Sequence, residues 1–557
     1  MTERYEAVVV GAGPSGLATA LELARQDVET LVLERGKFPG SKNATGGIIY
    51  GQTNTEHNLD DVVPDLHENA PLERPIDGYE FHCMANEKVQ SFDLTDLHQH
   101  NHKWSYTVLR SRFDRWLGER AHEACREAGG GLLSDVRVNG PLVENGEIVG
   151  VETEELDPIR ADMVVAADGA TSEMVRQAGL RDWEEPEDWF QGVKVVLDVP
   201  EDLIEENFDL DDEGEAHLFA GNIFEGVRGG GFLYTNDDTL SIGTVFHLDS
   251  LAENGTEPHR LMDRLLEHPL VQDWVGPDAE EVEYSAKLIP DGKKMLVDQP
   301  YRGRMVAVGD AAGQLQAQGP IIKGMNLGIS AGILAGRSFA EAKAKNAPET
   351  VGERYHEALQ DSYIPTSVRP SSYEIAASTS ENEFVNGLLE SFARSWLGRK
   401  LIGSGVGQAR LESMMNSPSL MASAPDIRFS YVTLPEVIAE EAGEPVHGPP
   451  EGVVFEPRSL DDRIGDLTYD VDAGNPHIEL LDDRPEISAT AVHTCPVSDR
   501  EISRGCYRFE TRKANGGKER FVALDTQPCV ECGTCAIVAD TDWDHPRGGK
   551  GVEYEYG

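Results

Sequence analysis

Three cysteines near the end of the chain, Cys529, Cys532 and Cys535, are each separated by two residues. This spacing presents three thiolates on one tight loop, which is how proteins hold a [4Fe–4S] cluster. In two-cluster ferredoxins a further cysteine follows four residues after the third, but this chain has Ala539 there. The pattern therefore predicts a single cluster whose fourth thiolate comes from a distant part of the chain.

Two upstream cysteines could supply that fourth thiolate. Cys495 is followed by proline, as in the ferredoxin pattern, and is the expected ligand. Cys506 is followed by tyrosine and is the alternative. A structural zinc site is also open, but zinc sites use cysteines in C-x₂-C pairs, which three at equal spacing disfavour. The two remaining cysteines, Cys83 and Cys125, are expected to be buried or inert thiols.

A glycine loop near the start, GAGPSG at residues 11–16, is a second redox signature. The pattern predicts a buried strand at residues 5–10, a helix at 14–26 and another strand at 30–33, closed by Glu34. A glycine loop between strand and helix, with an acid about 20 residues beyond it, is typical of a dinucleotide-binding βαβ unit. Two electron carriers on one chain indicate an electron-transfer enzyme.

Each glycine of the loop has its own expected task. Gly11 permits the tight turn, Gly13 lets the backbone approach a pyrophosphate, and Gly16 lets the helix pack on the strand. The helix N-terminus then offers amides to the phosphates. Glu34 would accept hydrogen bonds from a ribose. Neighbouring residues expected to touch the same ligand are Pro14, Ser15 and Arg35.

The composition excludes several classes of function. The chain has 557 residues, which predicts two to four domains, and it carries 99 acidic against 49 basic residues, a net charge of −50. A surface this acidic argues against nucleic-acid binding and suggests adaptation to a salty cytoplasm. We expect no signal peptide after Met1. The sequence has no run of 18 or more apolar residues, so no membrane-spanning helix is predicted. The expected location is the cytoplasm.

Three loops taken together resemble those of the glutathione-reductase-like FAD proteins. They are GAGPSG at 11–16, Asp168-Gly169, and Gly309-Asp310-Ala-Ala-Gly313. Arg112-Phe-Asp resembles the branch that holds p-hydroxybenzoate hydroxylase and the geranylgeranyl reductases, in which the residue matching Asp310 contacts FAD. No second glycine fingerprint is present, so a separate NAD(P)H-binding domain is not expected.

Within that branch the chain resembles the electron-transfer-flavoprotein:quinone oxidoreductases and their FixC relatives. The resemblance rests on PGSKNATGG at 39–47, GGGFLYT at 229–235, and Gly324-Met325 after the third loop. It implies FAD contacts for the following residues: Gly11, Gly13, Pro14, Ser15, Gly16, Glu34, Arg35, Asn43, Gly46, Gly47, Arg112, Asp168, Gly169, Gly309, Asp310, Gly313, Gly324, Met325 and Asn326.

The tail of the chain resembles FixX, a ferredoxin-like partner of FixC. The similar segments are Pro476-His477-Ile478, the cysteine loop at 529–535, and the stretch from Trp543 to Gly557. The chain thus looks like a FixC–FixX fusion, with the cluster held by Cys495, Cys529, Cys532 and Cys535. The family has a shorter segment between Cys-Pro and the tyrosine than this chain has, which leaves Cys506 as a rival.

The resemblance implies an α/β fold with a glutathione-reductase-like FAD-binding Rossmann domain, a β-rich substrate domain and a C-terminal ferredoxin-like α+β module. The expected division of the chain is residues 1–184 and 301–345 for the FAD-binding domain, 185–300 for the quinone-side domain, 346–433 for a helical region, 434–458 for a linker, and 459–557 for the [4Fe–4S] domain.

The implied activity is transfer of electrons from a two-subunit electron-transfer flavoprotein, through the cluster and FAD, to a membrane quinone such as menaquinone or ubiquinone. Peripheral attachment to the inner face of the cell membrane is also implied, and Leu388–Ile402 is a candidate contact, with a core-facing helix as the alternative. Other open readings are a geranylgeranyl or polyprenyl reductase, an aromatic hydroxylase that uses NAD(P)H, and a bare electron carrier.

Overall fold

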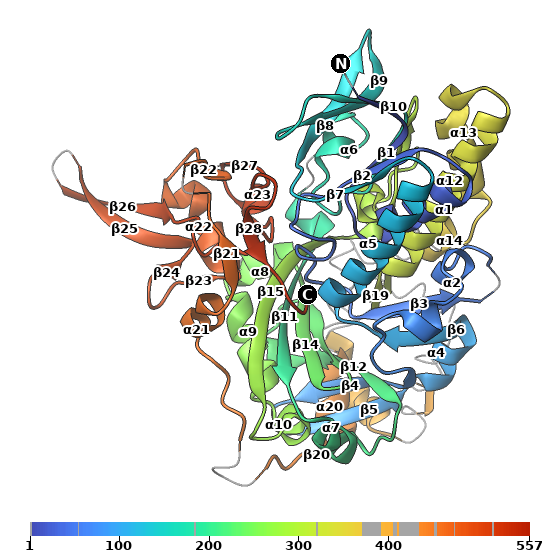
Figure 1. Cartoon of the computed structure of the whole chain (residues 1–557). Coiled ribbons are helices and arrows are strands. Elements are labelled where there is room, and N and C mark those ends of the chain that lie inside the picture. The colour runs from blue at the N-terminus through green and yellow to red at the C-terminus, as the bar shows by residue number, and fades with distance from the viewer. Residues whose placement is uncertain are drawn as a thin grey trace.

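The structure is a computed structural model that describes residues 3–53, 55–182, 185–318, 321–369, 391–404, 409–410, 434–449, 454–472, 474–514 and 517–557. Two eight-stranded sheets form the body of the molecule, and the C-terminal hundred residues form a smaller part beside them (Figure 1).

The first sheet is built on the predicted βαβ unit. Strand β1 (Arg4–Val10) pairs in parallel with β2 (Thr30–Leu33) on one side and with β10 (Ile159–Ala166) on the other. Helix α1 (Pro14–Arg25) crosses between β1 and β2. The central strands are continuous apolar runs because both faces of the sheet are covered. The other members of the sheet are β7 (Gly131–Leu133), β8 (Val138–Glu144), β9 (Glu147–Thr153), β16 (Tyr301–Arg302) and β17 (Met305–Ala307).

Helix α12 (Met325–Ala344) packs on α1 with almost no gap between the two backbones. A Cβ at Gly332 would lie 2.3 Å from the Ser15 carbonyl oxygen, and a Cβ at Gly328 would lie 2.2 Å from Ser15 Oγ. Helix α5 (Arg110–Glu127) covers α1 on its other side. The run of small residues in α12 therefore sets how closely the glycine loop is held.

The second sheet has the strand order β15-β11-β14-β13-β12-β4-β5-β20. It includes β4 and β5, which come from residues 76–93 and are predicted from the sequence to belong to the first domain. They join the second sheet because β4 pairs in parallel with β12 over eight residues. Helices α7 to α10 connect its strands. The bounds are β4 (Ile76–Ala85), β5 (Lys88–Asp93), β11 (Trp189–Asp198), α7 (Glu201–Phe208), β12 (Gly214–Gly221), β13 (Gly229–Thr235), β14 (Thr239–His247), α8 (Leu248–Asn254), α9 (Pro258–Leu266), α10 (Pro269–Val275), β15 (Glu280–Pro290) and β20 (Glu444–Pro445).

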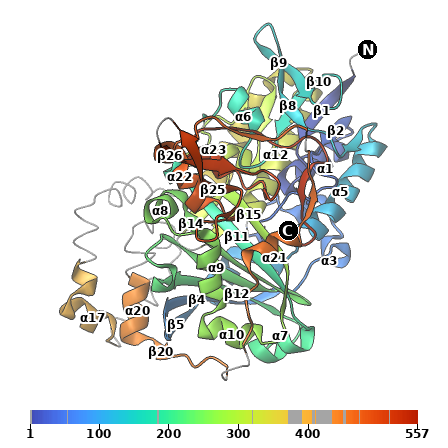
Figure 2. The same ribbon diagram turned by 90° about the vertical axis from the view of Figure 1, so that its left-hand side faces the viewer.

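In its described residues, the C-terminal part has four antiparallel strand pairs and three helices. Both views show it, in orange and red, against β15 (Figures 1 and 2). We call residues 459–557 the C-terminal module. Its elements are α21 (Leu460–Gly465), β21 (Thr468–Asp470), β22 (Ile478–Leu480), α22 (Pro485–Thr494), β23 (Ser498–Asp499), β24 (Arg504–Gly505), β25 (Tyr507–Ala514), β26 (Gly517–Leu524), α23 (Cys535–Val538), β27 (Thr541–Trp543) and β28 (Gly551–Glu553).

The segment 434–458 is predicted to be a linker, but its first part is ordered. Helix α20 (Leu434–Ala442) packs on β4, and β20 adds an edge strand to the second sheet. The remaining helices and strands are β3 (Ile48–Gln52), α2 (Leu59–Val62), α3 (Leu66–Asn69), α4 (Thr95–Asn101), β6 (His102–Thr107), α6 (Glu173–Gln177), α11 (Gly292–Met295), β18 (Gln316–Gln318), β19 (Ile321–Lys323), α13 (Val351–Gln360), α14 (Ile364–Val368) and α17 (Trp396–Ile402).

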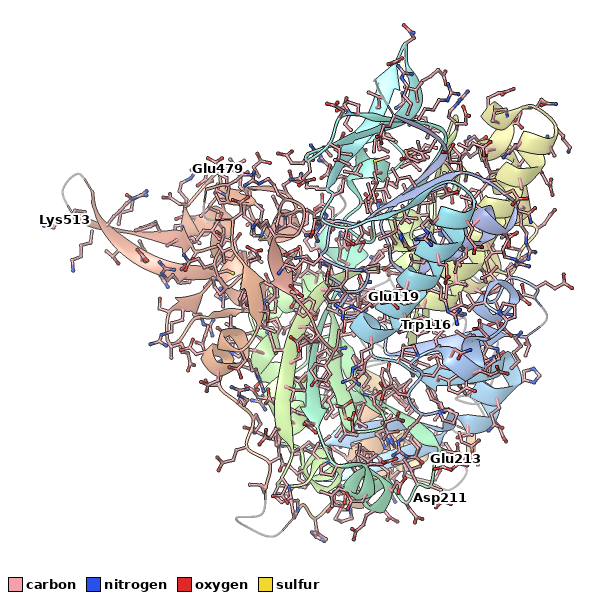
Figure 3. All side chains as sticks on the ribbon, in the orientation of Figure 1. Trp116, Glu119, Asp211, Glu213, Glu479 and Lys513 are labelled. Carbon is pink, nitrogen blue, oxygen red and sulfur yellow. The ribbon has the colours of Figure 1, made fainter. Side chains whose placement is uncertain are left out.

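Acidic side chains are distributed over the surface of every part of the molecule. Figure 3 labels Glu119, Asp211, Glu213 and Glu479, which come from different parts of the chain and are all exposed. This distribution agrees with the acidic surface expected from the composition. Within the described ranges, no helix has the length and apolar character needed to cross a bilayer.

Replacing Gly332 with alanine tests the packing of α12 on α1. In an open helix this change stabilises by about 1 kcal/mol. Here the added methyl group would strike the Ser15 carbonyl, so we expect a net loss of about 1–3 kcal/mol and a lower melting temperature. Gly465→Ala is the matched control, because nothing lies within 4 Å of a Cβ at this helical position. Equal melting temperatures for the two variants would contradict the close packing.

Candidate functional site

A pocket lies between the glycine loop and the second sheet, and we call it the central pocket. Most of the residues predicted to contact FAD line it. They are Gly11, Gly13, Pro14, Ser15, Glu34, Arg35, Asn43, Gly46, Gly47, Asp168, Gly169, Asp310, Gly324 and Met325. Segments far apart in the sequence are thus brought to one site.

The pocket offers a cradle of the kind that a dinucleotide needs. A Cβ on Gly13 would meet no atom closer than 3.9 Å, and a Cβ on Gly169 would meet none within 4 Å, so both backbones face open space. In the described chain, no side chain caps the N-terminus of α1, which leaves its first amides for a phosphate. Glu34 accepts hydrogen bonds from Ala12 N (2.8 Å) and Gly36 N (2.6 Å), which fix its carboxylate beside the loop. These features fit FAD.

Two partly buried carboxylates lie on the wall of the central pocket. Burial raises the pKa of Asp168, although Ser172 Oγ (2.6 Å) and Met174 N (3.1 Å) donate hydrogen bonds to it. Burial also raises the pKa of Asp310, and the nearby Arg110 opposes that rise. Both side chains can therefore accept hydrogen bonds from a bound polar group at little further cost of desolvation.

Five of the predicted contacts lie outside the pocket lining. Gly16, Gly309 and Gly313 serve backbone packing instead: a Cβ on Gly16 would lie 2.1 Å from Gly11 O. Asn326 is buried in the first turn of α12, with no partner for its Oδ1 among the described residues. Arg112 lies 5.2 Å from the centre of the Tyr556 ring and is partly exposed.

Arg110 lines the pocket where Arg112 was expected. Helix α5 begins at Arg110, so Arg110 and Asp114 share one face, and Arg112 lies on another. Arg110 Nη2 donates to Asp114 Oδ2 at 2.8 Å, and the pair is buried. The i, i+4 spacing of these opposite charges was the sequence signal that could have identified the right arginine.

Three lysines that the sequence analysis did not select also line the pocket. Burial lowers the pKa of Lys194 and of Lys287 to about 8, and that of Lys323 to about 7. Each lysine lies beside apolar strand residues. A charged residue next to such residues is the sequence signal that could have identified it. These amines can hold or release a proton near neutral pH.

One end of the pocket is apolar. Lys323 closes that end, with its Nζ 3.3 Å from His102 Nε2 and 4.5 Å from the centre of the Tyr50 ring. His102 Nδ1 lies 2.8 Å from the carbonyl oxygen of His98, which assigns the proton to Nδ1 and leaves Nε2 to accept from Lys323. The apolar residues of this end are Leu218, Phe232, Tyr234, Val245, Ile289 and Ile322.

All five cysteines of the C-terminal module line one small cavity. Cys495 and Cys506, the two candidates for the fourth ligand, both line this cavity together with the three cysteines of the loop. All five cysteines are buried. No three of these sulfurs, within the part of the chain that is described, lie within 4.8 Å of one another. Zinc with Zn–S bonds of about 2.3 Å would hold four sulfurs about 3.8 Å from one another, so no three of the described sulfurs have the spacing of a single zinc site.

Strands β11 and β15 of the second sheet hold the cysteine segments in place. Gln191 Nε2 donates to the Thr494 carbonyl (2.7 Å) and to Thr534 Oγ1 (2.6 Å), which lie next to Cys495 and Cys535. Tyr284 Oη donates to the Pro496 carbonyl at 2.7 Å. His477 Nε2 lies 3.4 Å from Cys529 Sγ. The cavity is thus positioned by two domains.

The cysteine loop and the central pocket share strand β15. Leu288 lines the pocket, and its backbone N–H donates to the Cys532 carbonyl at 3.0 Å. Lys287 also lines the pocket, and its Nζ donates to the Glu531 carbonyl at 3.1 Å. His545 of the C-terminal module forms part of the pocket wall. One strand therefore separates the two candidate cofactor sites.

Glu531, between two cysteines of the loop, forms a buried ion-pair network with Arg35 and Lys42, which follow the glycine loop in the sequence. Its carboxylate is 2.7 Å from Arg35 Nη1 and 3.0 Å from Lys42 Nζ, and its side chain is 1% exposed. Burial alone would raise its pKa, but Arg35, Lys42 and Lys287 hold that pKa well below its ordinary range. The carboxylate thus stays ionised and joins the two domains.

Replacing Glu531 with glutamine should cost about 3–5 kcal/mol of unfolding free energy, because Arg35 and Lys42 would stay buried without their counter-charge. Since the folded pKa of Glu531 is depressed, its contribution is present above the unfolded pKa of about 4.3 and is lost as the pH falls toward the folded pKa. Denaturant unfolding at neutral and acidic pH should show that the unfolding free energy of E531Q falls less, as the pH is lowered, than that of the native protein.

Glu479→Gln in the same module is the control, because Glu479 is exposed and its loss should change stability by less than about 0.5 kcal/mol. If E531Q and E479Q were equally stable at neutral pH, the network would not join the domains.

Comparison with known proteins agrees with this geometry. Residues 6–119 match a family described as FAD dependent oxidoreductase, and residues 142–362 match one described as FAD binding domain. The chain is 37% identical over 341 residues to Protein FixC of Escherichia coli K12, covering 61% of this chain and 77% of that protein. It is 34% identical over 348 residues to a probable electron transfer flavoprotein-quinone oxidoreductase, YdiS, of the same strain, covering 62% of this chain and 78% of that protein.

A solved structure shares the fold. It is a geranylgeranyl bacteriochlorophyll reductase-like protein from Thermoplasma acidophilum, with a TM-score of 0.55 and 18% identity, covering 79% of this chain and 99% of that one. The sequence relatives show the family as well as the fold, since the FixC match spans more than two thirds of that protein. The chain belongs to the FixC family and is an FAD-dependent electron-transfer oxidoreductase.

Proposed function

We propose that this protein is an electron-transfer flavoprotein:quinone oxidoreductase of the FixC/FixX type. It would pass electrons from a two-subunit electron-transfer flavoprotein, through a [4Fe–4S] cluster and FAD, to a membrane quinone. The observation that carries the proposal is the direct contact between the cysteine loop and strand β15, where Leu288 lines the central pocket and bonds to Cys532. Two redox groups placed on either side of this strand would be close enough to exchange electrons.

The cysteine cavity supports a cluster better than a zinc ion. In the described chain, no three of its sulfurs share the close spacing that one zinc ion requires, although Cys506 contacts both Cys495 and Cys529. We assign the fourth ligand to Cys495, because the residues on both sides of it are held by Gln191 and Tyr284. Cys506, the alternative, lies between β24 and β25, where its carbonyl accepts a hydrogen bond from Asp525 N at 2.8 Å.

Bound FAD supplies one- and two-electron redox chemistry, and a [4Fe–4S] cluster supplies one-electron transfer. The protein contributes position, charge and protons. Reduction of a quinone to its hydroquinone takes two electrons and two protons. Lys323 lies at the apolar end of the pocket with a pKa of about 7, so it can hold a proton there, and His102 Nε2 accepts its hydrogen bond.

The apolar end of the pocket suits a quinone ring, and the surface offers a contact for its membrane. Phe392, Trp396, Leu397 and Leu401 are large apolar side chains in or beside α17, and Trp396 is 71% exposed. This favours membrane contact over the core-facing alternative for Leu388–Ile402, of which Leu388 and Leu389 lie outside the described residues. Such a surface is typical of peripheral membrane binding.

The hairpin β25–β26 is suited to receive an acidic protein partner. It projects from the C-terminal module, with Lys513 near its tip (Figures 1 and 3). Residues 507–524 carry five basic and two acidic side chains in a chain of net charge −50. Opposite charge steers association, and Cys506, at the base of the hairpin, lines the cluster cavity. We assign this hairpin to docking of the electron-transfer flavoprotein.

The first test of the proposal is cofactor content under anaerobic conditions. We expect one FAD and about four iron atoms per chain, with a paramagnetic signal on reduction. Cys532→Ala should abolish the iron and the signal while FAD stays bound. Cys125→Ala is the control, because this buried thiol is far from the cavity and should leave both cofactors in place. Zinc in place of iron would exclude the electron relay.

The same preparations distinguish the activity. Reduced electron-transfer flavoprotein should bleach the flavin of the native protein and support quinone reduction, and it should do neither at the same rate in C532A. Hydrogenation of a prenyl lipid without quinone reduction would favour the reductase alternative.

Serine variants test the assignment of the fourth ligand. Cys495→Ser should lose the cluster or strongly change its spectrum, because it removes a thiolate from a rigid position. Cys506→Ser should retain about four irons per chain and the native signal. Iron analysis and low-temperature electron paramagnetic resonance measure both outcomes, and the reverse pattern would transfer the role to Cys506.

A further inference from the structure

A repeated sequence pattern lies on two neighbouring strands, away from both cofactor sites. Strand β4 carries Glu80-Phe-His82, and strand β12 carries Glu215-Ala-His217. Alternate residues of a strand face the same side of a sheet. The strands are parallel, with His217 opposite Glu80, so the two glutamates and two histidines gather on one face.

Three potential ligand atoms converge on this face. His82 Nε2 lies 3.1 Å from His217 Nδ1 and 3.5 Å from Glu80 Oε2. The ligand atoms of Glu80, His82 and His217 all lie within 4.8 Å of one another. A tetrahedral ion with bonds of about 2.0–2.1 Å would separate two nitrogens by about 3.3 Å. The observed spacing is that of ligands around one small ion.

The other ring nitrogen of each histidine lies close to an oxygen atom, although only His82 Nδ1 makes a hydrogen bond there. His82 Nδ1 lies 2.8 Å from Ser91 Oγ, and His217 Nε2 lies 3.1 Å from Glu215 Oε2. Metal-binding histidines usually donate their second N–H to a carboxylate or another oxygen, which fixes the tautomer and the ring. Gly78 leaves room for this arrangement, because a Cβ there would lie 2.7 Å from Glu215 Cγ.

The surroundings suit a site that opens to water on one side. The rings of His82 and His217 are buried, and the Trp274 ring lies 4.5 Å from His217 and 5.5 Å from His82, centre to centre. The Glu80 side chain is 38% exposed and provides the route of entry. Leu218, the next residue along β12, lines the central pocket, so His217 faces the opposite side of the sheet.

We propose that Glu80, His82 and His217 form a binding site for a divalent transition-metal ion, with Ser91 hydrogen-bonded to His82 and the Glu215 carboxylate beside His217 Nε2. Two imidazoles and one carboxylate are a donor set that zinc favours, and three protein ligands leave a fourth position for water. The ion would join β4, which comes early in the chain, to β12 and so stabilise the second sheet. This site is independent of the proposed electron transfer.

The test uses the flavin- and iron-loaded protein, freed of loose metal with a chelator and titrated with Zn²⁺ alone by calorimetry and metal analysis. We expect one tightly bound zinc in the native protein, and its loss in the double variant H82Q/H217Q with flavin and iron unchanged. The control is His100→Gln, an exposed histidine that should leave zinc binding unaltered. Zinc should also raise the melting temperature of the native protein and not of the double variant.

Two further measurements separate this site from the cysteine cavity. X-ray absorption of the bound zinc should show nitrogen and oxygen neighbours at about 2.0–2.1 Å, and sulfur at about 2.3 Å would overturn the proposal. Glu215→Gln should weaken zinc binding about 10–100-fold while the protein stays folded, because it removes only the carboxylate charge beside His217 Nε2. Zinc bound equally by the native protein and by H82Q/H217Q would also overturn it, leaving these histidines as a metal-free hydrogen-bonded pair.

Discussion

The relation between the two candidate cofactor sites depends on one buried carboxylate. Glu531 lies between two cysteines of the loop, with a backbone φ of 52°, and it remains ionised out of water because it meets cations and accepts a hydrogen bond from Val552 N. Arg35 and Lys42 are those cations, and Arg35 directly follows the acid that ends β2. A cysteine loop displaced from this position would leave charges of both signs buried and unpaired. The penalty therefore selects one placement of the C-terminal module on the flavin-binding body.

That placement gives strand β15 two roles at once. Its side chains line the central pocket, and its backbone and Lys287 bond to the cysteine loop. Neighbouring β11 contributes in the same way, because Lys194 lines the pocket while Gln191 holds the segments next to Cys495 and Cys535. A sheet is suited to this task, since its hydrogen-bonded ladder keeps both faces in a fixed relation. The spacing between the two sites is thus set by strands and not by a flexible tether.

Local patterns predicted the parts of this site that a short segment can specify. The glycine loop, the strand before it and the acid after it are all encoded within 30 residues, and the cysteine loop within seven. What the sequence did not reveal depends on contacts between distant segments. Arg110 replaces Arg112 because the helix starts at Arg110, and β4 joins the second sheet because β12 pairs with it. That the three lysines share one pocket depends on how their strands are placed around it.

The same structure reconciles an extremely acidic chain with a cationic interior. The acids that Figure 3 labels lie on the surface, whereas Arg35, Lys42, Lys194 and Lys287 gather around the central pocket and the cysteine loop. Dissolved salt screens exposed charges at separations beyond about 3–10 Å, but it screens buried pairs much less. Concentrated salt would therefore relieve repulsion among the surface acids while leaving the Glu531 network nearly intact. A protein built in this way can carry a large net surface charge, because salt screens its buried ion pairs only weakly.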